Sequence, residues 1–262
     1  MMVMSTLFII LRPKRDLYLQ QIVNSMKQIS SGEYDRAHLE ENNVKGFSHI
    51  LRNPALTSAE RNHYLDINEK ESNRLSNLST NMQKLSWLEE INSDLNKERF
   101  RLDQQIKEVS LTMEYHWSRK DIELSVKLQE VQCSANEELL NQVWINLLDN
   151  AIKFAPNHGQ IQIELTTTQR GPVVNIKDNG IGMTEEEQIR IFERFYKSDR
   201  SRSPEKKGSG LGLSIVQKII DLHQWKISVS SVPNEGTTFT VILTDGEEAK
   251  HNNIDMTPNG DL

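Results

Sequence analysis

The chain has 262 residues, of which 36% are hydrophobic and 26% are charged, and its formal net charge at pH 7 is −6. This length suits one ordinary domain plus a smaller unit, because domains cluster at about 100 to 150 residues. The acidic balance gives no general attraction to nucleic acid, so a nucleic-acid partner is not expected. The single cysteine, Cys133, excludes an internal disulfide framework and indicates a reducing compartment.

Residues 1–34 are expected to form a truncated membrane-proximal linker helix. Residues 1–11 are largely apolar, and Arg12, Lys14 and Arg15 follow almost at once. A spanning helix needs about 20 apolar residues, so this run cannot cross a bilayer alone. Basic residues after the run obey the positive-inside rule and favour the cytoplasmic end of a truncated membrane helix, that is, a membrane tether. A short buried or disordered start is the alternative.

Residues 35–92 are predicted to form a helical dimerisation hairpin. Its long second helix is expected from about residue 57 to 89, with Thr57 or Ser58 as the cap and Glu60 in the first turn. Apolar residues then recur at steps of three and four, at Leu75, Leu78, Met82 and Leu85. A second copy of the hairpin would bury this stripe, which predicts a homodimeric four-helix bundle.

From residue 96 the sequence pattern changes to a mixture of short strands and helices. Runs of two-residue alternation or β-rich composition occur at 122–124, 161–165, 173–176, 227–229 and 238–242. Helical periodicity occurs between them, at 102–115, 137–154, 185–195 and 211–223. This interleaving predicts an α+β sandwich over residues 96–246, in which a mixed sheet carries helices on one face. Residues 247–262 are polar and are predicted to be a disordered tail.

The first candidate site lies in the helix predicted at 137–154, within the string NLLDNAIKF. Asn146 and Asn150 are four residues apart and project from one helix face, and Lys153 lies a turn beyond Asn150. Amide oxygens can ligate Mg²⁺, and an ammonium group can neutralise a phosphate oxygen. Asparagines on helices are more often solvated or capping residues, so this motif does not decide the function alone.

The second candidate site is the string DNGIGM, which directly follows an apolar strand. The carboxylate of Asp178 can accept a hydrogen bond from an exocyclic amine, while Gly180 and Gly182 let the backbone pass close to a flat ring. The alternative is a plain turn, because Asp-Asn-Gly is among the commonest turn strings.

The third candidate site is a glycine-rich loop that opens the last predicted helix. Its residues are Gly208, Ser209, Gly210, Leu211, Gly212 and Leu213. Glycines let the backbone fold around phosphates, and free N–H groups at a helix start attract anions. The loop is neither a Rossmann fingerprint, since no strand leads into it, nor a Walker loop, since no Gly-Lys-Ser/Thr follows.

Together these strings resemble a known family. In chain order, NLLDNAIKF, DNGIGM, IFERFYKSD and GSGLGLSIV are similar to the asparagine, first glycine, phenylalanine and second glycine boxes of the histidine kinase ATP-binding domain. Four compound motifs in this order leave little room for coincidence. The resemblance covers residues 100–244 and implies a Bergerat-type α/β sandwich, preceded by the α-helical hairpin, that binds ATP and Mg²⁺.

The resemblance also implies a role for individual residues. Asn150, helped by Asn146, would hold Mg²⁺, and Asp178 would read adenine. The implied ATP-binding positions are Asn146, Asn150, Lys153, Asp178, Gly180, Gly182, Arg194, Gly208, Gly210, Leu211, Gly212, Leu213 and Thr238.

The phosphoacceptor segment departs from the family. The family's acceptor sits in a string of the form His-Glu/Asp-x-Lys/Arg-Thr/Asn-Pro, and the chain holds no such string. His49 lies in the nearest string, SHILRNP, but Ile50 takes the place of the acidic residue that acts as general base. His38 has acidic neighbours but lacks the basic residue and the proline. His38 and His49 therefore remain the two candidate acceptors.

The resemblance implies an ATP-dependent protein-histidine kinase, the transmitter portion of a two-component system. It would pass the γ-phosphoryl group of ATP to a histidine and then to a response regulator, as a homodimer with its catalytic portion in the cytoplasm. The alternative is a dimeric signalling remnant that binds nucleotide without autophosphorylation. ATP-driven clamps of the gyrase type share the fold, but they use a catalytic glutamate where this chain has Asn146.

Overall fold

The computed structural model describes residues 51, 56–91, 95–198 and 209–244, and the chain divides into two compact units, Met1–Trp87 and Leu88–Leu262. The predicted linker helix, both candidate histidines, Gly208 and the predicted tail lie outside the described residues.

The described part of the first unit is dominated by helix α3, Ser58–Glu90, whose last residues belong to the second unit. Thr57 caps it: the N–H of Glu60 donates to Thr57 Oγ1 at 3.3 Å, and the N–H of Thr57 donates to Glu60 Oε2 at 2.9 Å. This reciprocal pair is a capping box. Leu78 and Leu85 of the predicted stripe are buried. A long helix is therefore present where the second helix of the hairpin was predicted, whereas the predicted first helix falls outside the described residues and the hairpin stays a prediction.

The second unit is built on a five-stranded mixed sheet in the order β2-β4-β5-β7-β6. Its strands are β2 (Glu123–Leu128), β4 (Gln160–Thr168), β5 (Gly171–Asp178), β6 (Lys226–Val232) and β7 (Gly236–Ile242). The pair β2 and β4 is parallel and the other pairs are antiparallel. The register places the last residue of β5, Asp178, opposite Thr237 at the start of β7. The predicted mixed sheet is confirmed.

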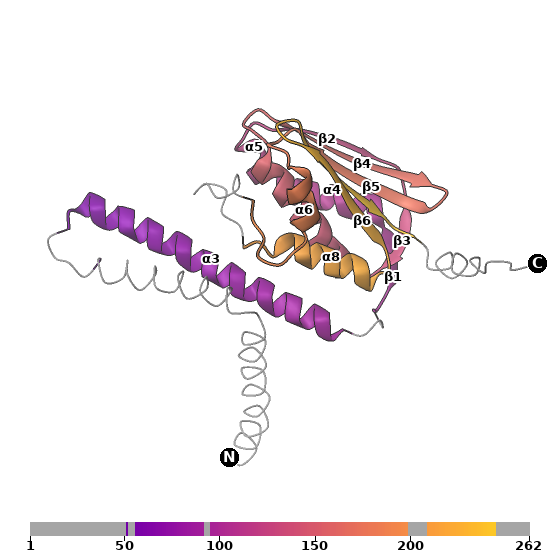
Figure 1. The fold of residues 1–262 in the computed structure, drawn as a ribbon, viewed down its shortest axis with the longest axis horizontal. Helices are drawn as coiled ribbons and strands as arrows, with labels where there is room; N and C mark the ends of the chain where they lie inside the picture. The colour runs from indigo at the N-terminus through magenta and orange to yellow at the C-terminus, as the bar shows by residue number, and fades with distance from the viewer. Residues whose placement is uncertain (1–50, 52–55, 92–94, 199–208, 245–262) are drawn as a thin grey trace, which may run out of the picture. The chain divides into compact units, whose positions relative to one another are not determined.

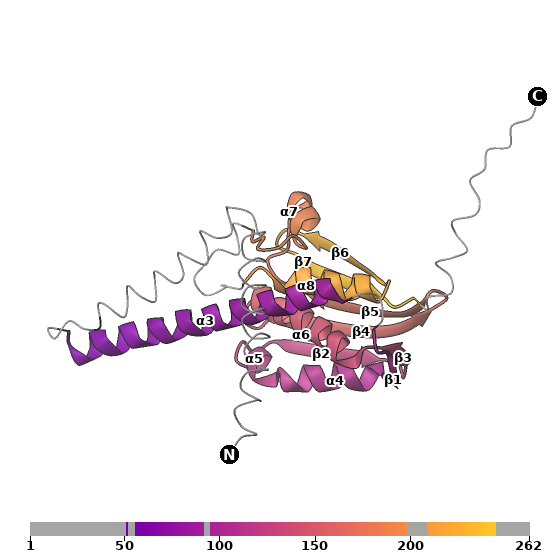
Figure 2. The same ribbon diagram turned by 90° about the horizontal axis from the view of Figure 1, so that it is seen from below.

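Three helices lie on one face of this sheet: α4 (Leu102–Thr112), α6 (Glu137–Phe154) and α8 (Gly212–Leu222) (Figures 1 and 2). The central helix, α6, packs against both of the others and against β5. Its buried side chains include Leu140, Trp144, Leu147 and Leu148. From Val174 to the end of β5 every second residue is buried, so Val174, Ile176 and Asp178 share one face. Because this is the face on the apolar core, the carboxyl of Asp178 lies at the edge of that core.

A buried histidine, His223, connects the start of α6 with the end of α8. The Nδ1 atom of His223 lies 2.8 Å from the carbonyl oxygen of Ile219, and Nε2 accepts a hydrogen bond from the N–H of Asn136 at 3.1 Å. Asn136 is the N-cap of α6, and its side chain accepts from Leu139 N–H at 3.0 Å. One ring therefore joins the start of α6 to the end of α8, and these two helices carry two of the predicted motifs.

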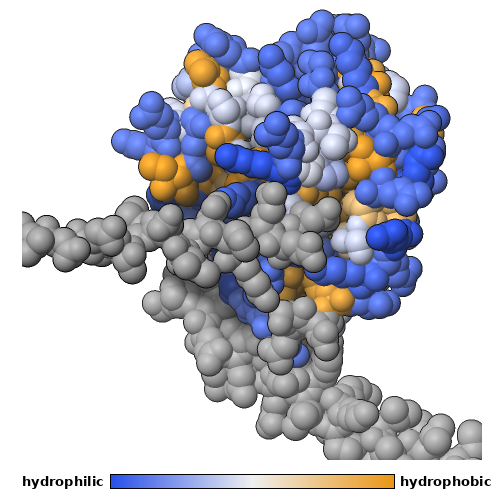
Figure 3. Space-filling view, turned by 90° about the vertical axis from the view of Figure 1, so that its right-hand side faces the viewer, coloured by the Kyte–Doolittle hydropathy of each residue, from blue (hydrophilic) through white to orange (hydrophobic). Residues whose placement is uncertain are grey.

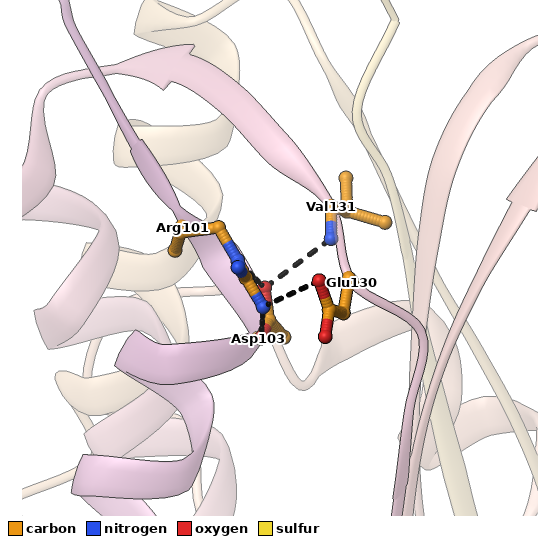
Figure 4. A network of polar contacts seen from close by, with 4 residues as sticks. All are labelled: Arg101, Asp103, Glu130 and Val131. Carbon is orange, nitrogen blue, oxygen red and sulfur yellow. Dashed lines mark hydrogen bonds and ion pairs between the residues drawn. The ribbon is translucent and has the colours of Figure 1, made fainter.

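Two short elements complete the second unit at the start of α4. Strands β1 (Glu98–Arg101) and β3 (Gln132–Ala135) form a separate antiparallel pair. Figure 4 shows how this pair is tied to α4: Arg101 makes two hydrogen bonds of 2.7 and 2.8 Å to Asp103, which also accepts from the N–H of Val131. Glu130 adds an ion pair of 3.2 Å to Arg101. The hydrogen bonds from Arg101 are the main reason why the pKa of Asp103 is lowered.

The predicted helix at 185–195 is shorter in the structure. Helix α7 spans Glu185–Arg190, and a capping box between Thr184 and Glu187 fixes its start. The following residues form turns, and Phe195 has a φ of +60°, which a right-handed helix does not accommodate. The short helix α5 (Glu114–Ser118) and strand β3 were not predicted.

The surface of the described part of the chain is mostly hydrophilic where Figure 3 shows it. Figure 3 shows one face on which hydrophilic residues cover most of the described surface, with apolar residues between them. Among the described helices, none has both the length and the hydropathy that crossing a bilayer requires.

Candidate functional site

The asparagine motif lies on α6, at its contact with the start of α8. Asn146 and Asn150 are both half-buried. The Asn146 side-chain oxygen lies 3.4 Å from the point that a Cβ atom on Gly212 would occupy. Its Nδ2 is buried and finds no hydrogen-bond partner among the described residues. A buried amide without a partner is uncommon, because leaving it unpaired costs about 1–3 kcal/mol.

The glycine-rich loop leads into an open helix terminus. Helix α8 begins at Gly212 and has no side-chain hydrogen bond at its cap, Leu211, whose own side chain is buried. The first N–H groups of a helix lack intrahelical acceptors and carry its positive end, so this terminus suits a phosphate. Leu213 is half-buried in the first turn.

A backbone contact joins the phenylalanine string to the glycine-rich loop. The N–H of Phe195 donates to the carbonyl oxygen of Gly210 at 2.9 Å. Gly210 has a φ of +78°, and a Cβ atom there would come within 2.8 Å of the Phe195 backbone. Only glycine combines this conformation with so close an approach. The phenylalanine string IFERFYKSD and the glycine-rich loop therefore lie in contact in the fold.

Asp178 ends strand β5 with its carboxyl inside the protein. The residue is 4% exposed, and its Oδ1 accepts from the N–H of Gly180 at 2.8 Å. Burial raises the pKa of the carboxyl to about 6, although backbone hydrogen bonds from Gly180 and Thr237 act in the opposite direction. A buried acceptor with unused lone pairs is suited to an amine donor from a ligand.

The turn after Asp178 lies against the other end of α6. A Cβ atom on Gly180 would come within 2.6 Å of the carbonyl oxygen of Phe154, the last residue of that helix. Gly182 is buried, and a Cβ atom there would overlap the backbone of Val232. Helix α6 therefore touches both glycine motifs, one near Asn146 and one at Phe154, which are about 12 Å apart at 1.5 Å per residue.

Thr237, the neighbour of the predicted Thr238, shares the face of Asp178, and the ATP-binding role of Thr238 stays a prediction. Thr237 lies opposite Asp178 in the ladder, and residues directly opposite in a sheet point to the same face. Thr238 points to the other face, away from the helices, because successive side chains alternate along a strand. The alternation of Thr237 with the apolar residues Phe239 and Val241 could have identified it from the sequence.

Two further polar residues, not predicted, brace this corner of the sheet. The Ser231 hydroxyl accepts from the N–H of Met183 at 2.9 Å, donates to the carbonyl of Gly236 at 2.8 Å and lies 3.0 Å from Thr237 Oγ1. The Gln188 side chain exchanges two hydrogen bonds, of 2.9 and 3.1 Å, with the Ser231 backbone. No sequence signal marks either residue, since the hydrogen bonds between Gln188 and Ser231 and from Met183 to Ser231 join positions more than 40 residues apart.

The two predicted cations differ in their surroundings. Lys153 is half-buried, and its Nζ lies 5.0 Å from the centre of the Phe154 ring. Arg194 is exposed, and its guanidinium pairs with the carboxylate of Glu89, which belongs to the same compact unit. The structure thus brings Asn146, Gly212 and the turn at Gly180 to one helix, while the phosphate role of Arg194 stays a prediction.

Comparison with known proteins identifies the domain. Residues 135–247 match the sequence profile of the family described as histidine kinase-, DNA gyrase B-, and HSP90-like ATPase. The heme sensor protein HssS of Staphylococcus epidermidis is 33% identical over 239 residues, which are 86% of this chain and 51% of HssS. The signal transduction histidine-protein kinase ArlS of Staphylococcus aureus is 39% identical over 123 residues, 47% of this chain and 27% of ArlS. The chain thus spans about half the length of HssS and about a quarter of that of ArlS.

Solved structures agree. The mycobacterial sensor histidine kinase MprB superposes with a TM-score of 0.52 and 29% identity, covering 56% of this chain and 97% of that structure. The histidine kinase ThkA in complex with the response regulator protein TrrA gives a TM-score of 0.68 at 22% identity, over 88% of this chain and 66% of that chain, a likeness of fold. Residues 135–247 thus carry a domain of the histidine kinase-, DNA gyrase B-, and HSP90-like ATPase family, and the chain is similar to sensor histidine kinases over most of its length.

Proposed function

We propose that the chain is the transmitter portion of an ATP-dependent protein-histidine kinase. The observation that carries this proposal is the arrangement around α6. Through Phe154 this helix contacts the turn at Gly180, which follows the buried carboxyl of Asp178. Through Asn146 it contacts the start of α8, which has no side-chain cap. An adenine amine would bind at Asp178, and the phosphates would extend toward the start of α8.

Magnesium fits the same helix. The side-chain oxygens of Asn146 and Asn150, one helical turn apart, are the candidate ligands, and the buried Nδ2 of Asn146, a donor without a partner among the described residues, suits a phosphate oxygen. Neutral amide ligands suit a cation that is also bound to phosphate, because Mg²⁺ takes few protein ligands beside phosphate oxygens. Asn150 and Asn146 would hold the ion, which would offset phosphate charge when bound. Lys153 would contribute a further positive charge from the last turn.

Phosphoryl transfer would then follow the kinase pattern. A histidine nitrogen attacks the γ-phosphorus, the bond to the bridging oxygen breaks, and ADP leaves. In such reactions the protein contributes positioning and electrostatic stabilisation rather than covalent chemistry. The phosphoryl group would pass on to a response regulator, and the response regulator bound to ThkA is a precedent on this fold.

The assembly is proposed to be a homodimer through the helical hairpin of residues 35–92. Leu65 and Trp87 on α3, which are 47% and 49% exposed, support this. A second subunit would cover such large apolar side chains. We further propose that residues 1–34 link the hairpin to a membrane tether, with the catalytic portion, residues 96–246, facing the cytoplasm, where ATP is available.

A phosphorylation assay tests this function. The full chain is incubated with γ-labelled Mg-ATP, and acid-labile, base-stable phosphate on the protein is the expected result. The variants His38→Gln and His49→Gln, alone and together, identify the acceptor. Loss of label in one of them assigns that histidine, whereas persistent label in the double variant shows that another residue accepts the phosphoryl group. Bound ATP without any label would contradict kinase activity and return the signalling remnant, which the kinase relatives do not favour.

A further inference from the structure

The last turn of α6 carries ligand-binding residues at a helix end that cannot complete its own hydrogen bonds. The helix ends at Phe154, one residue before the sequence Ala155-Pro156. Proline has no N–H group, so the carbonyl of Ile152, four residues earlier, has no helical donor. The carbonyls that follow it at a helix C-terminus are also unpaired within the helix. Some other donor must therefore satisfy this end.

The donor is the side chain of Lys120, which comes from the connection between α5 and β2. Its Nζ donates to the carbonyl oxygens of Ile152 at 2.7 Å, Lys153 at 3.2 Å and Ala155 at 2.7 Å. These three acceptors match the three N–H groups of an ammonium. The positive charge also lies at the negative end of the helix dipole, where a cation is stabilising.

The main chain of Lys120 holds the segment that leaves the helix. The N–H of His158 donates to the carbonyl oxygen of Lys120 at 2.8 Å. Lys120 therefore contacts the chain on both sides of Pro156, with the side chain before it and the backbone after it. The ammonium bonds the carbonyls on either side of Phe154, and the Phe154 carbonyl faces the turn at Gly180.

We propose that Lys120 is a positioning residue for nucleotide binding, because its ammonium fixes the turn of α6 that presents Asn150 and Lys153. This inference rests on the proposed function. It assigns to a residue outside the four motifs the task of holding the metal- and phosphate-binding side chains at their working orientation. Groups that orient ligands in this way commonly change metal affinity about 10- to 100-fold when they are removed.

The test measures how strongly Mg²⁺ enhances nucleotide binding. Calorimetry on the full chain gives the dissociation constant of AMP-PNP with excess Mg²⁺ and with EDTA, and the ratio of the two is the magnesium enhancement. Lys120→Met keeps the aliphatic stem and removes the ammonium, Lys120→Arg restores a cation with several donors, and Lys120→Gln keeps an amide donor. Lys127→Met, an exposed lysine on β2, is the matched control.

We expect Lys120→Met to reduce the magnesium enhancement about tenfold. Lys120→Arg should return it to within about twofold of the parent, and Lys127→Met should leave it unchanged. If Lys120→Met does not fold, Lys120→Gln gives the same comparison, with a reduction of about threefold. An unchanged enhancement overturns the proposal. The proposal is also overturned if Lys120→Met weakens AMP-PNP binding equally with and without Mg²⁺ and Lys120→Arg does not restore it, because this result indicates a merely structural role. A parent chain that binds no AMP-PNP contradicts the proposed function itself.

Discussion

Replacing the buried carboxyl of Asp178 by an amide separates what folding requires from what binding requires. Burial raises the pKa of Asp178 to about 6 from its ordinary value of 3.8, so the fold disfavours the ionised form. Because the folded pKa lies above the unfolded one, the contribution to stability is fully present below pH 3.8 and is lost as the pH rises to about 6. At about 1.4 kcal/mol per pKa unit, the loss amounts to about 3 kcal/mol at neutral pH.

We expect Asp178→Asn to raise the free energy of unfolding at about pH 7.5 by about 2 kcal/mol, since an incompletely paired buried amide offsets about 1 kcal/mol. Urea denaturation measures the gain, which should give way to a loss of about 1 kcal/mol near pH 4, where the parent carboxyl is largely protonated and only the cost of the amide remains. Asp121→Asn is the control, because Asp121 is exposed and asparagine tolerates its φ of +51°. A gain of equal size at both pH values, or a loss at neutral pH, would refute the reasoning.

The same variant should bind nucleotide less well. The carboxylate accepts hydrogen bonds without donating any, so an amide exchanges part of this acceptor capacity for donors that face an adenine amine. We expect Mg-ATP affinity to fall by at least about 1 kcal/mol, or about fivefold, in calorimetry. A more stable protein that binds ATP less tightly is the predicted signature of Asp178. Unchanged affinity would remove adenine recognition from this residue.

Three further predictions concern the ends of the helices and the corner of the sheet. Burial lowers the pKa of His223 from its ordinary value of 6.5, so the free energy of unfolding should fall as the pH drops below 6.5. His223→Gln should make the free energy of unfolding, measured by urea denaturation, less dependent on pH in this range; an unchanged dependence would contradict the assignment. Thr237→Val should weaken Mg-ATP binding by about 1 kcal/mol, whereas Thr238→Val should have a smaller effect; calorimetry showing the reverse would assign the contact to Thr238. Thr57→Ala should lower the free energy of unfolding by about 1 kcal/mol, because it removes the capping box with Glu60. Urea denaturation curves of the variant and the parent that coincide would contradict this.

Local signals predicted most of the fold. Helix α6 matches the prediction of 137–154 because the cap Asn136 and the proline at 156 mark both ends in the sequence. Strand β3, Gln132–Ala135, was missed because it has four residues and is stabilised by pairing with β1, more than thirty positions earlier. The helix predicted at 185–195 was too long, because the backbone hydrogen bond between Phe195 and Gly210 gives this segment a conformation that local propensity does not reveal.

The site shows the same division between local and long-range information. Asn146, Asp178 and Gly212 could be predicted, because each belongs to a string with its own chemical logic. Lys120 and His223 could not, since each bonds residues more than thirty positions away and lies in a segment without a motif. Such residues do not contact the proposed ligand, and only the fold shows that they hold the helices that do.

The most direct measurement of the central claim is a crystal structure of the chain with Mg²⁺ and AMP-PNP. We expect one nucleotide whose exocyclic adenine amine lies about 3 Å from the carboxylate of Asp178. Its phosphates should contact the first N–H groups of α8, with the metal on the amide of Asn150. A nucleotide bound elsewhere, or one whose adenine amine lies beyond hydrogen-bond reach of Asp178, would contradict the account.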